Sequence, residues 1–66
     1  SLADAEPPDA GELETLLTAL SYTPVAVDEL IKTTALTASA VQTLLLVLEL
    51  EGKIEWASGQ LVALRA

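Results

Sequence analysis

The apolar residues of the chain first recur with the period of a helix. Their spacing of i, i+3, i+4 and i+7 predicts an amphipathic helix from about residue 10 to residue 20. Its apolar face consists of Leu13, Leu16, Leu17 and Leu20. Asp9 and Glu12 have the spacing of a capping box at its start. Pro24 ends the helix, because a residue before proline is pushed out of the α region.

A short β-prone run and a second helix follow. Val25, Ala26 and Val27 predict an edge strand of two or three residues. We expect a brief helix to begin at the acidic residues Asp28 and Glu29, which favour a helix N-terminus. Its apolar residues, facing inward, are Leu30 and Ile31.

A third helix is predicted between Thr37, as its N-cap, and Gly52, where a left-handed residue is needed to stop it. Its apolar face is formed by Val41, Leu44, Leu45 and Leu48. Two strand-like runs, 53–56 and 60–64, then surround the short connection 57–59, which contains a glycine. This is the pattern of a β-hairpin.

The element order predicts a mainly α fold with a small β-hairpin, a winged helix-turn-helix over residues 11–66. Three helices, the hairpin wing and a short edge strand between the first two helices make up this fold. The alternative is a three-helix bundle with an irregular tail, but the last thirteen residues contain too many Val, Ile and Leu for a tail. Residues 1–10 are small, acidic and contain two prolines, which predicts a linker. Because the chain starts at Ser1 rather than Met, we expect a domain excised from a longer chain.

Three segments resemble the C-terminal winged-helix domain of the DNA-processing protein A (DprA) family. They are residues 24–31 (PVAVDELI), 34–37 (TALT) and 46–54 (LVLELEGKI), and the resemblance covers roughly residues 11–64. Two positions depart from the family pattern. Ala35 stands where the helix-turn-helix corner usually has Gly, and Ala26 stands where a Ser or Thr usually caps the second helix.

The resemblance implies a cytoplasmic protein that binds incoming single-stranded DNA during natural transformation and helps a RecA recombinase to load. In that family the single-strand site and the main dimer surface belong to a Rossmann-like domain, which these 66 residues do not contain. The implied role is therefore that of a noncatalytic accessory domain.

Composition and charge narrow the function further. The chain has no Cys, His or Met, which excludes thiol and imidazole chemistry and the usual zinc ligands, so we expect no cofactor and no metal. Its longest apolar run is interrupted by Glu49 and Glu51, so no membrane association is expected. The formal net charge is −7, with only Lys32, Lys53 and Arg65 as cations, and a chain this acidic repels phosphate backbones.

DNA binding by this chain is therefore the less favoured hypothesis. In a DNA-reading protein the third helix would enter the major groove. No Lys or Arg occurs between Thr37 and Gly52, and nonspecific affinity depends on such residues. A weak double-stranded DNA binder and a transcription regulator remain the alternatives. Their candidate contacts are Ser39, Gln42, Thr43 and Lys53.

The favoured hypothesis is contact with protein, either another domain of the parent chain or a second subunit. On a helical wheel, Leu46 and Val47 point about 140° and 120° away from the apolar face, in opposite directions. With Trp56 on the wing they form a candidate protein-contact patch. The alternative is that both are isolated exposed aliphatic residues, which are common. Leu50 is expected to tuck under the wing, and Trp56 to pack inward with Ile54.

Overall fold

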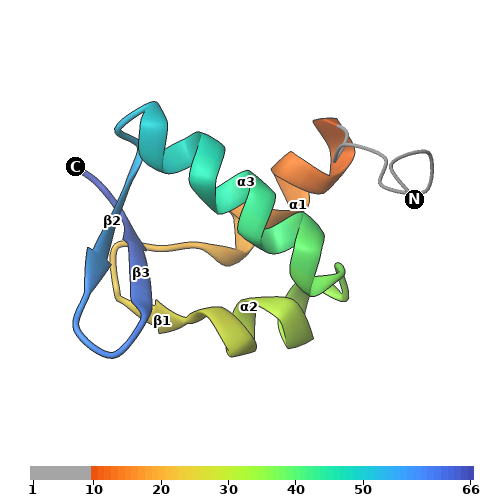
Figure 1. Cartoon of the computed structure of the whole chain (residues 1–66), viewed down its shortest axis with the longest axis horizontal. Coiled ribbons are helices and arrows are strands. Elements are labelled where there is room, and N and C mark those ends of the chain that lie inside the picture. The colour runs from red at the N-terminus through yellow and green to blue at the C-terminus, as the bar shows by residue number, and fades with distance from the viewer. Residues whose placement is uncertain (1–9) are drawn as a thin grey trace.

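The computed structural model describes residues 10–66 and contains three helices and a small antiparallel sheet (Figure 1). The elements are α1 (Ala10–Ala19), β1 (Val25–Ala26), α2 (Val27–Thr34), α3 (Ala38–Leu50), β2 (Ile54–Ala57) and β3 (Leu61–Leu64). The winged helix-turn-helix expected from the sequence is therefore confirmed. The linker expected over residues 1–10 and the capping role of Asp9 lie outside the described residues, apart from Ala10, which begins α1.

The corner between α2 and α3 is a three-residue turn at which the two helix axes differ in direction by 118°. Ala35 has a left-handed backbone with a φ of 59°, a conformation that favours Gly, the residue that usually stands at this corner in the family. Its N–H donates to the carbonyl of Ile31 at 3.0 Å. The Thr34 hydroxyl donates to the carbonyl of Leu30 at 2.7 Å and accepts from the N–H of Leu36 at 3.2 Å. These hydrogen bonds stabilise the corner although its left-handed residue, Ala35, carries a Cβ that disfavours this conformation.

Helix α3 has a defined cap at each end. The side chain of Thr37 accepts from the N–H of Ala40 at 3.0 Å, which confirms its role as the N-cap. At the other end Gly52 has a φ of 72° and donates to the carbonyl of Glu49. Lys53 donates to the carbonyl of Leu48 at 2.9 Å, which completes a Schellman motif. α3 is therefore stopped where the wing begins.

The sheet has the strand order β1-β3-β2, so β1 and β2 are both edge strands. Val62 lies opposite Val25 on one side and Trp56 on the other. β1 has two residues, within the expected two or three, and Val27 belongs to α2, whose first turn carries two acidic residues that favour a helix N-terminus. β3 starts one residue later than expected, because the left-handed Gln60 (φ 61°) belongs to the turn.

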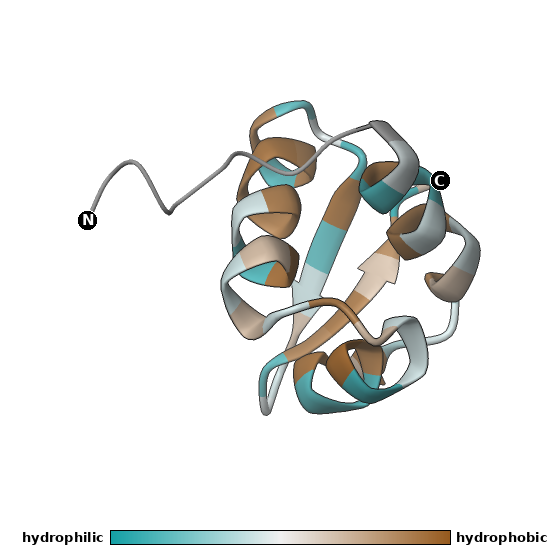
Figure 2. Ribbon diagram, turned by 90° about the vertical axis from the view of Figure 1, so that its right-hand side faces the viewer, coloured by the Kyte–Doolittle hydropathy of each residue, from teal (hydrophilic) through white to brown (hydrophobic). Residues whose placement is uncertain are grey.

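The core is aliphatic and lies between the three helices and the sheet. α3 provides four of its buried side chains. The others come from α1, α2, β2 and β3, and from Leu20, which directly follows α1. No side chain of a polar or charged residue is buried in the described part of the chain. Figure 2 shows hydrophobic residues on the elements that enclose this core. The largest fully buried side chains are Leu16, Leu30, Leu45, Leu48, Val41 and Val62.

No single helix within residues 10–66 has the length and apolar character needed to cross a membrane. α2 and α3 meet that criterion only when taken together as a bent pair.

The left-handed backbone of Ala35 leads to a prediction about stability. Replacing Ala35 with Gly is expected to raise the free energy of unfolding by about 0.5–1 kcal/mol, because Gly has no Cβ to strain this backbone. Urea denaturation followed by circular dichroism measures the change. The control is Ala40→Gly within α3, which should lower the same quantity by about 0.5–1 kcal/mol. If Ala35→Gly instead lowers the free energy of unfolding, the backbone of Ala35 is not strained by its Cβ.

Candidate protein-contact surface on the third helix and the wing

The outer face of α3 is unusually apolar. Its inner face is fully covered, with Val41, Leu45 and Leu48 each no more than 2% exposed. Leu46 is nevertheless 55% exposed and Val47 42% exposed. In Figure 2 the C-terminal half of α3 is coloured mainly as hydrophobic, which agrees with its sequence. The two candidate residues on α3 are therefore accessible to a partner.

Leu50 extends this apolar face, and the expectation that it tucks under the wing is wrong. It is 79% exposed, the most exposed large apolar side chain of the described residues. It lies four residues after Leu46 and seven after Thr43, so all three share the outward side of the helix. The helical wheel could have found Leu50, since it lies nearly opposite the buried positions.

Trp56 is also placed differently from the expectation that it packs inward with Ile54. Ile54 is 3% exposed, whereas Trp56 is 44% exposed. Both side chains point to the same face of the sheet, because they are two residues apart on β2. β2 is an edge strand, however, so no further strand flanks the tryptophan, and one part of the ring faces solvent.

Trp56 and Leu46 line one groove between α3 and the wing, with a volume of about 400 Å³. The structure therefore brings two of the three predicted patch residues together. Val47 does not line the groove and lies on the other flank of α3. The groove is lined by Val27, Gln42, Leu45, Leu46, Glu49, Trp56 and Gln60.

The four residues proposed for DNA contact are exposed. The only cation among them is Lys53, and it is already paired. Ser39 and Thr43 lie on the outer face, and Gln42 lines the groove. The Nζ of Lys53 lies 3.6 Å from Oε1 of Glu51, so its charge is already partly compensated. The described residues contain seven carboxylates against three cations, which makes the potential of this surface negative.

The fold agrees with the comparison with known families. The sequence profile of the DprA winged helix domain matches residues 1–60, which include all three helices and β2. The chain belongs to this family. Among curated proteins, none matches it.

A DprA winged helix domain is an accessory domain, and winged helix domains are generally not catalytic. Within residues 10–66 of this domain, no group of three or more Asp, Glu, His or Cys residues could hold a metal ion. No buried side-chain nitrogen or oxygen in that range lacks a hydrogen-bond partner.

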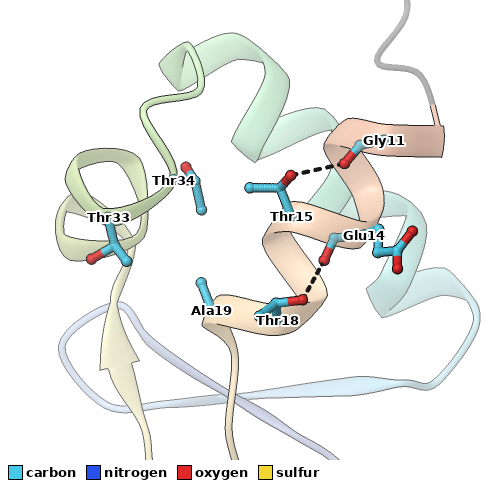
Figure 3. Close-up of a pocket in the computed structure, with 7 residues that line it drawn as sticks. All are labelled: Gly11, Glu14, Thr15, Thr18, Ala19, Thr33 and Thr34. Atoms are coloured by element: carbon cyan, nitrogen blue, oxygen red, sulfur yellow. Dashed lines mark hydrogen bonds between the residues drawn. The ribbon is translucent and has the colours of Figure 1, made fainter.

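A second groove, of about 490 Å³, lies between α1 and the end of α2 (Figure 3). The hydroxyls of two of its threonines, Thr15 and Thr18, are turned to their own helix. Thr15 donates to the carbonyl of Gly11 and Thr18 to that of Glu14, both at 2.9 Å. Glu14 is the only ionisable residue among the described residues that line it. The groove is lined by Gly11, Glu14, Thr15, Thr18, Ala19, Thr33 and Thr34.

Adjacent leucines of α3 should respond very differently to truncation. Leu45→Ala is expected to lower the free energy of unfolding by about 2–5 kcal/mol, because it opens a cavity in the core. Leu46→Ala should cost less than about 1 kcal/mol, since more than half of its side chain is exposed. Urea unfolding of both variants tests this. Equal losses would mean that Leu46 serves the core and is not kept for a partner.

Proposed function

We propose that this DprA winged helix domain is a noncatalytic module that contacts protein, either another domain of the parent chain or a second subunit. The contact is made by the α3–wing surface, defined as Leu46, Val47, Leu50 and Trp56. One observation carries the proposal. The helix that would enter the major groove in a DNA-reading protein exposes three aliphatic side chains and contains no basic residue.

The charge of the domain opposes the DNA-binding alternative. Affinity for nucleic acid comes largely from cations that neutralise phosphates. α3 has none, and the nearest cation of the wing, Lys53, is paired with Glu51. Ser39 and Thr43 could donate hydrogen bonds to phosphates, but such contacts do not offset seven carboxylates in the described residues. Double-stranded DNA binding and a role as a transcription regulator are therefore less well supported.

The composition of the α3–wing surface suits a protein partner. Interface cores are depleted in charge and enriched in aromatic residues, and their strongest contacts are often made by tryptophan. Trp56 and Leu46 provide an aromatic and an aliphatic anchor in one groove. The large exposed fractions of Leu46 and Leu50 leave apolar area that burial against a partner would remove from water.

The context of this contact comes from the family. The resemblance implies a protein that handles incoming single-stranded DNA for a RecA recombinase in the cytoplasm, with the DNA site on a separate Rossmann-like domain. In such a protein, an acidic winged helix serves to position the parts of the assembly and leaves the nucleic acid to the other domain.

Fluorescence anisotropy with a labelled DNA duplex at low salt tests this proposal. We expect a Kd for the duplex weaker than about 100 μM even at low salt, which is beyond the weak end of ordinary nonspecific affinity at physiological salt. Submicromolar binding that weakens steeply as salt is added would defeat the proposal.

A gain-of-charge variant provides the matched control. Ser39 and Thr43 are exposed on α3, and neither side chain makes a hydrogen bond within the described residues. The double variant Ser39→Lys, Thr43→Lys should bind duplex measurably and with a salt dependence, because it restores cations to the helix. If it binds no better than the original chain, the missing cations do not explain the absence of DNA binding.

A further inference from the structure

We propose that the groove between α3 and the wing binds a cationic, amphipathic helical segment of a protein. This inference rests on the proposed function and adds the chemistry of the partner. The occupant presents apolar side chains to Leu46 and Trp56 and a lysine or arginine to Glu49.

The shape of the groove sets the size of the occupant. Along α3 its lining runs from Gln42 to Glu49, a distance of about 10 Å at 1.5 Å per residue. Two turns of a partner helix cover the same length, so two or three apolar side chains spaced as i, i+3 or i+4 and i+7 fit along it. The centre is apolar, because Val27, Leu45, Leu46 and Trp56 contribute their side chains there. The amides of Gln42 and Gln60 supply polar groups around them.

Charge complementarity identifies the sign of the partner. Glu49 is the only charged residue that lines the groove, and it makes no ion pair within residues 10–66. Asp28 and Glu29 follow directly after Val27, another lining residue, and both are exposed. None of the three cations of the described residues lines the groove, and Lys53 is directed to Glu51. A partner that binds in the groove is therefore expected to carry a positive side chain.

The end of α3 strengthens this preference. The C-terminus of a helix carries partial negative charge and is stabilised by cations. The last turn of α3 contains Glu49 and no basic residue, so the carboxylate and the helix dipole have the same sign at the same place. A lysine or arginine from a partner would interact favourably with both.

The same charges disfavour a second copy of this domain in the groove. Each copy has a formal net charge of −7, so two copies repel one another at low salt. A nucleic acid is disfavoured for the same reason. A basic protein segment remains as the occupant that satisfies both the apolar centre and the acidic rim.

Trp56 is the only tryptophan of the chain and reports directly on the groove. The probe is a synthetic amphipathic helix of about 14 residues made of leucine and lysine, with a leucine–glutamate peptide of the same pattern as its counterpart. We expect the lysine peptide to shift the Trp56 emission to shorter wavelength at low salt and the glutamate peptide to leave it unchanged. The affinity should fall as salt approaches about 0.15 M, because exposed charges are screened.

Two variants with identical net charge separate a specific site from general attraction. Glu49→Lys should weaken binding of the lysine peptide about three- to tenfold, the range for loss of an exposed ion pair and its replacement by repulsion. Glu14→Lys, on α1 and outside the groove, should change it less than about twofold. Leu46→Ala should also weaken binding.

Three results would overturn the inference: no binding of the lysine peptide, equal binding of the glutamate peptide, or equal weakening by the two charge variants. None of them would decide the proposed function, which the DNA measurement tests separately. If the domain binds the DNA duplex and its groove also binds the lysine peptide in preference to the glutamate peptide, only the proposed function is overturned.

Discussion

The structure depends on the burial of one side of α3. Leu16 of α1, Leu30 of α2 and Ile54 of β2 all belong to the core that includes Val41, Leu44, Leu45 and Leu48 of α3. A chain of this size buries only about 60% of the surface that its unfolded form exposes. The remaining elements are too few to surround a thirteen-residue helix, so its outer side stays open. The same shortage that limits stability leaves a helix face free for a partner.

Local signals were sufficient to predict most of the fold. Thr37 and Gly52 mark the ends of α3 because a side-chain cap and a left-handed glycine act within a few residues of the helix end. Ala35 is more informative, since its side chain gives no hint of a left-handed backbone and only the resemblance to the DprA family indicated one. The Thr34 hydroxyl, which bonds on both sides of this corner, was not foreseen.

The surface was predicted less completely, because it depends on contacts between distant parts of the chain. The exposure of Leu46 follows from helical periodicity alone, and that of Leu50 could have been inferred in the same way. The position of Trp56 could not. Alternation along β2 correctly places it on the same face as Ile54, but its exposure depends on the strand order, which leaves β2 at the edge of the sheet.

The edge position of β2 has a consequence for how this domain avoids unwanted association. Within the part of the chain that the structure describes, no strand pairs with the outer side of Ile54–Ala57, so its backbone groups could act as a template for another chain. The strand has only four residues, carries Glu55 at its centre and follows Lys53. Short length and charge both discourage the edge-to-edge pairing that leads to continuous sheets. The wing can thus expose a tryptophan to other proteins through its side chain while its backbone remains a poor starting point for aggregation.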